Sequence, residues 1–242
     1  MSPLSGVLGE AWALYKRYAS HFIGLSFALY LVIAVINALL SWALGGYGAL
    51  IGVILTVFGM FLLQAALVKA VQDVRDGTVD LDLRATIAAA MPYVAAVALA
   101  SILAAIGIGV GLFVFIVPGL VLITFWSMIV PEIVVGGAGA LDAFGRSWRI
   151  VRGNGWSVFG TLVVVFIVQI VAQFVISEIF FALALGWRSL IADLVSGALV
   201  APFIAAVVTL VYYRLTAAHG ERAEPAGPDA GGYGPQDGGY PA

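Results

Sequence analysis

The sequence predicts an all-α, polytopic membrane helix bundle with six transmembrane helices, and with an amphipathic interfacial helix before spans 1, 3 and 5. Two observations lead to this prediction. First, 63% of the 242 residues are hydrophobic and only 10% are charged, whereas a soluble domain typically has about 25% charged residues. Second, the apolar residues are gathered in long runs without a charge, each long enough for two helices that cross about 30 Å of hydrocarbon.

The predicted spans follow from the places where these runs are broken. From Phe22 to Val68 there is no Asp, Glu, Lys or Arg, and the run is broken at Gly45-Gly46-Tyr47-Gly48. The run from Ala85 to Pro131 is broken between Gly107 and Gly119, and the region from Trp156 to Val211 is interrupted by three charged residues. Because one span needs about 20 apolar residues, the spans are placed near residues 22–44, 49–68, 88–110, 117–136, 156–180 and 190–213.

Lysine and arginine are distributed unevenly over the loops of this arrangement. Ten of the eleven lie on one side, and only Arg188 lies on the other. Basic residues in short loops accumulate on the cytoplasmic side, which predicts a multi-pass protein of the cell (inner, cytoplasmic) membrane with both termini cytoplasmic. The ten residues are Lys16, Arg17, Lys69, Arg75, Arg84, Arg146, Arg149, Arg152, Arg214 and Arg222.

The two ends of the sequence lead to different expectations. A cleavable signal peptide has an apolar segment of about 7–15 residues, and the first apolar run is longer, so we expect the first span to be retained. From residue 217 onward the sequence is rich in Gly and Pro and has no aliphatic residue larger than alanine. Such a segment cannot bury enough apolar surface to fold. We therefore expect residues 1–216 to form the membrane domain and residues 217–242 to form a disordered cytoplasmic tail.

Three segments on the predicted cytoplasmic side have the pattern of amphipathic helices that lie along the membrane surface. Their apolar residues recur at three- and four-residue steps, while charged residues fall on the other face. The segments are residues 4–19, 83–91 and 141–152. Because Trp and Arg settle at the headgroup boundary, the candidate lipid-headgroup ligands are Arg146, Trp148, Arg149 and Arg152. The arginines favour anionic lipid; the alternative is that these helices only anchor the hairpins.

Polar residues within the predicted spans are the second group of candidates. They are Gln64, Glu132, Gln169 and Gln173. Polar side chains are costly in lipid and usually face the interior of a bundle. Two interpretations stay open: hydrogen bonds that hold neighbouring helices together, or a polar cavity that forms a substrate path. For Glu132, an ion pair with Arg146 or Arg149 is a further alternative.

Several function classes are disfavoured by composition. The net charge is −2, so no excess of basic residues is available to neutralise nucleic-acid phosphates. There is no cysteine, and the two histidines, His21 and His219, lack the spacing of a zinc motif. Four aspartates between residues 73 and 82 lack the Ala-Arg pair that intramembrane phospho-alcohol transferases carry between theirs. We therefore expect no catalytic residues, no metal, no cofactor and no nucleic-acid partner.

The stretch between residues 117 and 160 resembles a signature of bacterial and archaeal six-span membrane proteins. The matching residues are Asp142-Ala143-Phe144, Arg146-Ser147-Trp148, Arg152-Gly153-Asn154 and Trp156, together with Pro118-Gly119 and Pro131. These proteins are the glycerophosphoryl diester phosphodiesterase membrane-domain family and the related, uncharacterised YciC-type proteins. The resemblance implies the six-span fold and its topology. Phosphodiesterase activity belongs to a soluble domain fused to some members, and Glu132 follows Pro131 directly instead of several residues later, so neither the activity nor a role for this Glu is carried over.

These features favour a non-enzymatic integral membrane protein that acts in envelope or lipid homeostasis. The alternative is a transporter or permease component for a lipid-derived or small polar solute. Transport would need a water-accessible path that joins Gln64, Gln169 and Gln173, whereas a structural role would leave these groups paired and dry. The expected partners are membrane lipids, with a homo-oligomer or a second membrane protein left open.

Overall fold

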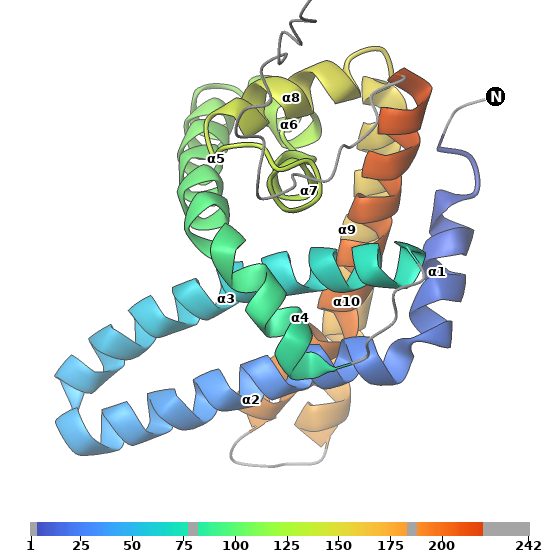
Figure 1. The fold of residues 1–242 in the computed structure, drawn as a ribbon. Helices are drawn as coiled ribbons and strands as arrows, with labels where there is room; N and C mark the ends of the chain where they lie inside the picture. Colours follow the sequence, from blue (N-terminus) through green and yellow to red (C-terminus); the bar gives the residue numbers. More distant parts are fainter. Residues whose placement is uncertain (1–3, 77–81, 183–187, 220–242) are drawn as a thin grey trace, which may run out of the picture.

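Helices make up almost all of the computed structural model, which describes residues 4–76, 82–182 and 188–219 (Figure 1). These ranges contain no strand, which confirms the all-α class. The elements in chain order are α1 (Val7–Arg17), α2 (Ala19–Leu44), α3 (Gly46–Asp76), α4 (Leu83–Ala90), a 3-10 turn η1 (Met91–Tyr93), α5 (Val94–Val114), α6 (Ile116–Phe125), α7 (Ile129–Val134), α8 (Asp142–Val151), α9 (Gly155–Ala182) and α10 (Arg188–His219). Residues 217–219 are therefore helical, and the rest of the predicted tail lies outside the described residues.

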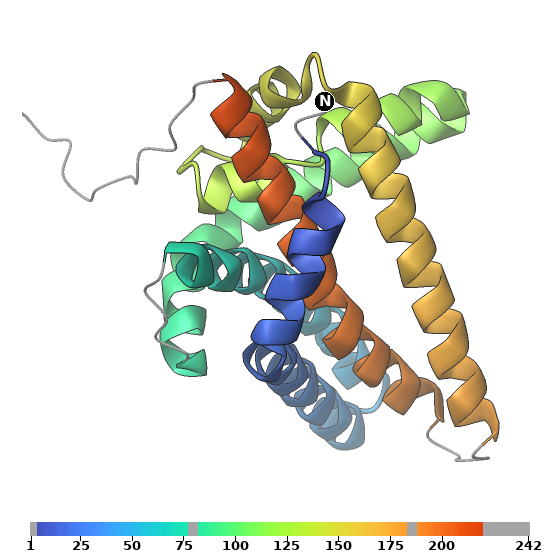
Figure 2. The same cartoon turned by 90° about the vertical axis from the view of Figure 1, so that its right-hand side faces the viewer.

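Six stretches are long and apolar enough to cross a membrane, which agrees with the predicted number. They are α2, α3, α4 with α5, α6 with α7, α9, and α10. Helices that follow one another pair as α2–α3, α5–α6 and α9–α10, and these three pairs run in different directions (Figures 1 and 2). Large apolar side chains stay exposed along them, as on α9, where Phe166 is 62% and Phe174 64% exposed. A helix that is apolar all round is typical of a membrane span.

Two of these pairs are hairpins that turn through a single residue. Gly45 alone connects α2 to α3, and its φ of 57° and ψ of −131° lie in a region that only glycine adopts readily. Phe115 alone connects α5 to α6 in an extended conformation. Aromatic side chains next to these turns are strongly exposed: Trp42 at 86%, Tyr47 at 81% and Phe113 at 92%. Exposed aromatic residues at helix ends are typical of a membrane–water interface.

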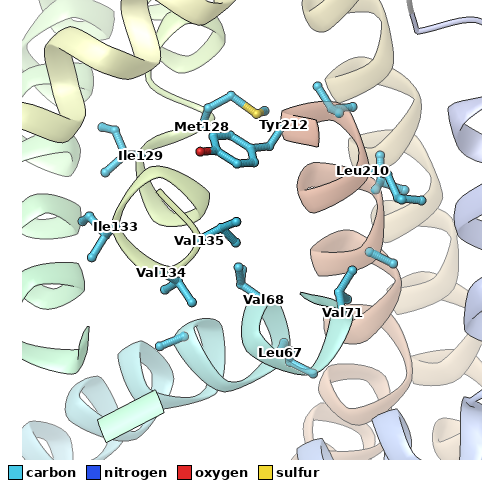
Figure 3. Close-up of a cluster of buried hydrophobic side chains, with 14 of the residues drawn as sticks. Leu67, Val68, Val71, Met128, Ile129, Ile133, Val134, Val135, Leu210 and Tyr212 are labelled. Atoms are coloured by element: carbon cyan, nitrogen blue, oxygen red, sulfur yellow. The ribbon is translucent and has the colours of Figure 1, made fainter. Parts of the chain in front are cut away.

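The most completely buried region surrounds the short helix α7, which packs against α3, α5, α8 and α10 (Figure 3). Buried side chains from three elements meet there. They are Leu67, Val68 and Val71 of α3, Met128, Ile129, Ile133, Val134 and Val135 in and beside α7, and Leu210 and Tyr212 of α10. Because α7 has only six residues, this packing and not helix propensity keeps it in place.

The predicted fourth span, 117–136, is not one continuous helix. α6 ends at Phe125, and a turn over Trp126–Met128 separates it from α7, which begins at Ile129. Pro131 has no N–H, so it cannot donate to the carbonyl of Ser127, its partner in an unbroken helix. The fourth span therefore consists of two helices, and α6 and α7 together have the length and hydropathy of one span.

The three predicted surface helices are present as α1, α4 and α8. Asp82 caps α4 by accepting a hydrogen bond from the N–H of Arg84 at 3.0 Å. α1 packs along α10 through the buried residues Val7, Ala11 and Tyr15, whereas Trp12 is 50% exposed. Burial raises the pKa of the Tyr15 phenol, whose hydroxyl donates to the carbonyl of Leu199 at 3.0 Å. α1 is therefore part of the bundle as well as a surface helix.

Candidate functional site

The candidate lipid-binding surface lies where α8 meets the start of α9. α8 is strongly amphipathic: Ala143, Ser147 and Ile150 are buried against the core. Its arginines face outward. This separation of faces follows from the three- and four-residue spacing of the buried positions, and it leaves the basic face available to the surroundings.

Ser147, on the buried face, holds the broken fourth span together. Its hydroxyl donates to the carbonyl of Phe125 at 2.6 Å and accepts from the N–H of Met128 at 3.2 Å. The Phe125 carbonyl lies at the end of α6 and has no partner within the helix. The Met128 N–H lies just before α7. Buried backbone groups of this kind need partners. Ser147 therefore links α8 to both halves of the span.

Arg146 is engaged by the protein itself. Its Nη1 lies 3.9 Å from Glu132 Oε2 and donates to the carbonyl of Gly136 at 3.4 Å. The Glu132 side chain is only 3% exposed, whereas that of Arg146 is 45% exposed. A buried carboxylate without a counter-charge is strongly unfavourable. Of the two arginines considered as partners of Glu132, the structure therefore selects Arg146.

The Glu132 carboxylate shares a small space with the hydroxyl of Tyr212. A Cβ atom added at Gly136 would lie 2.8 Å from both Glu132 Oε2 and Tyr212 Oη. That separation is shorter than real Cβ contacts allow. Gly136 therefore provides the room that lets side chains from α7 and α10 approach each other beneath Arg146.

Trp148 is anchored on α6, while Arg149 and Arg152 are free of such contacts. The Trp148 and Phe125 rings stack with their centroids 4.2 Å apart, which leaves Trp148 39% exposed. Arg149 and Arg152 are exposed, and within the described ranges neither forms an ion pair. The four candidate headgroup residues thus separate into one paired arginine, one anchored tryptophan and two available arginines.

A groove of about 630 Å³ adjoins this corner. One wall is apolar and is formed by Val117, Leu120 and Val121 of α6. The other contains Asn154 and Trp156, which directly follow Arg152 and the left-handed Gly153 (φ 90°). Trp156 is 87% exposed at the first turn of α9. The groove therefore combines an apolar wall with the polar side chains of Asn154 and Ser157, and Arg152 directly precedes its lining residue Gly153 in the chain.

The four polar candidates within the spans are not brought together. Glu132 is buried against Arg146, and Gln173 of α9 accepts a hydrogen bond from Ser196 of α10. Gln169 is exposed on α9. Gln64 of α3 lines a separate cavity between α2, α3, α7 and α10. Neither cavity described here joins the three glutamines.

Three residues near these sites were not identified as candidates from the sequence: Ser147, Tyr212 and Tyr30. Ser147 belongs to the Arg-Ser-Trp signature, so the sequence did mark its position. The structure shows that this serine has a structural role. Tyr212 and Tyr30, which lines the Gln64 cavity, lie in long apolar runs. No local pattern there separates a tyrosine that packs from one that faces a cavity.

Groups that would hold a metal are not found in the described part of the chain, where no three His, Cys, Asp or Glu residues converge. Two of the four clustered aspartates have structural contacts: Asp73 pairs with Lys69 at 3.6 Å, and Asp82 caps α4. Asp80 lies outside the described residues.

The fold and its exposed apolar helices define a multi-pass membrane protein. Comparison with known sequences gives the family: residues 13–219 match the profile of a domain of unknown function (DUF7847), and the chain belongs to this family. No curated protein and no solved structure matches the chain.

Proposed function

We propose that this protein is a non-enzymatic integral membrane protein that binds anionic phospholipid and acts in envelope or lipid homeostasis. The observation that supports this function most directly is the pair of exposed, unpaired arginines, Arg149 and Arg152, at the end of α8, where the chain enters the lining of the groove between α6 and α9 at Gly153. A phosphate at these arginines and an acyl chain along the apolar wall of the groove match this distribution of charge.

The energetic contribution of each arginine follows from its position. Near an anionic membrane surface, a basic side chain contributes about 1 kcal/mol, and an arginine can hold a phosphate through two parallel hydrogen bonds. Arg146 contributes less, because Glu132 already neutralises it. Trp148, stacked on Phe125, fixes the depth of α8. We therefore assign headgroup binding to Arg149 and Arg152.

The resemblance to the glycerophosphoryl diester phosphodiesterase membrane-domain family belongs to this proposal. Three of the residues that carry it have structural contacts: Ser147 bridges the broken span, Arg146 pairs with Glu132, and Trp148 stacks on α6. The shared signature is thus explained by how α8 docks on α6 and α7. It supports a common fold and gives no reason to transfer hydrolysis.

The proposed location is the cytoplasmic membrane with both termini in the cytoplasm. Arg214 near the end of α10 contacts Glu10 of α1, so both ends of the described chain lie at one end of the bundle. This arrangement requires an even number of crossings and supports the six-span topology. The excess of Lys and Arg on that side predicts that it faces the cytoplasm.

Lipid retention tests the function. The full chain is purified gently from membranes that contain phosphatidylglycerol, and retained lipids are quantified by mass spectrometry. R149Q/R152Q should lower retained anionic lipid by about 30-fold if each arginine contributes about 1 kcal/mol. K16Q/R17Q removes the same charge from two exposed residues of α1 and is the matched control. Equal losses in both variants, or no loss in R149Q/R152Q, would contradict the proposal.

A further inference from the structure

A second cavity lies between helices of the bundle, away from the α8–α9 corner. It has a volume of about 380 Å³ and is lined by residues of α2, α3, α7 and α10 and of the turn before α7. Binding sites for small molecules range from about 300 to 1,000 Å³ and are mostly apolar, with a few placed polar groups. Both the size and the lining of this cavity fall in that class.

The cavity lies against the break in the fourth span. Ser127 of the turn, and Val130 and Pro131 of α7, all line it. The Ser127 hydroxyl donates to the carbonyl of Thr124 at 2.7 Å, so its oxygen can still accept a hydrogen bond. Non-helical backbone at membrane depth is tolerated where it is buried in protein or lines a cavity, and interrupted helices frequently form the binding sites of transporters.

Two more polar residues, on other helices, line the cavity. The Tyr30 hydroxyl of α2 and the Gln64 amide of α3 have no hydrogen-bond partner among the described residues. Tyr30 lies tightly against α10: a Cβ at Gly197 would be 2.7 Å from its Cζ. Gln64 is exposed, so the cavity is open at this residue.

The remaining lining determines the ligand class. None of the described residues that line the cavity is charged, so nothing there would compensate for burying a charged ligand. Apolar side chains such as Leu67, Ala201 and Ala205 form most of the wall. Tyr30, Gln64 and Ser127 can together donate and accept hydrogen bonds. The matching ligand has an apolar body and one neutral polar group.

We infer that this cavity is a binding site for a neutral amphiphile that carries one hydroxyl or amide group. The inference does not depend on the anionic-lipid proposal, because the two sites are lined by different residues. It also gives the transporter alternative a specific location, at Gln64 and the broken helix and not along a path through Gln169 and Gln173.

Photolabelling of the full chain in phosphatidylcholine liposomes tests the inference. The probes are a diazirine derivative of octanol and the matching diazirine alkane, with labelled residues mapped by mass spectrometry. The alcohol should label the cavity wall on α3 and α10. A205F fills the cavity and should abolish this labelling, whereas A34F makes the same change at an exposed site of α2 and should preserve it.

A second pair of variants tests the polar group and does not depend on cavity filling. The wild type should prefer the alcohol to the alkane by about fivefold, the factor expected for one hydrogen bond. Q64L should remove this preference, and Q169L, the same change on α9, should not. Equal labelling in A205F and A34F, or a wild type that takes up both probes alike, overturns the inference. If A205F does not fold, the alcohol preference of Q64L compared with that of Q169L still tests the inference. R149Q/R152Q should leave the labelling unchanged, which separates this result from that of the lipid proposal.

Discussion

Arg214 and Glu10 are 204 residues apart in sequence, yet Arg214 Nη2 lies 2.5 Å from Glu10 Oε2. The Nη1 atom of the same arginine donates to the carbonyl of Ser5 at 2.6 Å. One guanidinium therefore ties the start of the described chain to the end of its last helix. Because α1 precedes the first span and Arg214 ends the sixth, this contact closes the bundle at one end.

A double-mutant cycle measures the strength of this contact. The side chains of Arg214 and Glu10 are 30% and 47% exposed, and exposed ion pairs typically contribute between about 0.2 and 1 kcal/mol. R214Q, E10Q and the double variant should give a coupling of about 0.5 kcal/mol in thermal unfolding in detergent. Raising the salt concentration should reduce it. A coupling of zero would show that the arginine acts through the Ser5 carbonyl alone.

Cysteine labelling checks the proposed topology, and the absence of native cysteine makes it straightforward. A membrane-impermeant maleimide should label G46C in intact cells, and should label G145C only after the cells are opened. Gly145 is exposed with open space at its Cβ position, whereas the neighbouring Ser147 is fully buried and would resist labelling on either side. Labelling of G145C in intact cells would reverse the proposed orientation.

Ser147 is expected to be the most sensitive small residue of α8. S147A leaves the Phe125 carbonyl and the Met128 N–H without their side-chain partner. A buried polar group left unpaired costs about 1–3 kcal/mol, so S147A should lower the unfolding temperature clearly. S20A, at an exposed position, is the control. An unchanged unfolding temperature would mean that the break in the fourth span does not need this serine.

The Glu132–Arg146 pair should behave asymmetrically on mutation. R146Q leaves a buried carboxylate without its counter-charge and should destabilise the protein by about 1–2 kcal/mol, less than a fully buried pair because Arg146 is 45% exposed. E132Q/R146Q carries neither charge and should regain most of that loss. R149Q, on the same helix and unpaired, should change little. Equal unfolding temperatures for R146Q and R149Q would contradict the assignment of Arg146 as the partner.

The sequence predicts those features that depend on local pattern. Charge-free runs give the six spans, and three- and four-residue spacing gives α1, α4 and α8. The break at Trp126–Met128 is marked locally only by Pro131, and its stabilisation by a serine 19 residues away from Met128 has no local signal. The same holds for the polar candidates: Gln64 and Gln173 look alike in sequence, but one faces a cavity and the other bonds to Ser196.

The single-residue turns at Gly45 and Phe115 leave two of the hairpins without a loop at their tips. In the proposed topology both turns face the outside, where they present almost no backbone beyond the helix ends. A soluble partner, protease or antibody arriving from that side would meet aromatic rings embedded at the lipid boundary and no loop to grip at these two hairpins. At these two hairpins, a binding partner would therefore have to contact the helix faces from within the bilayer.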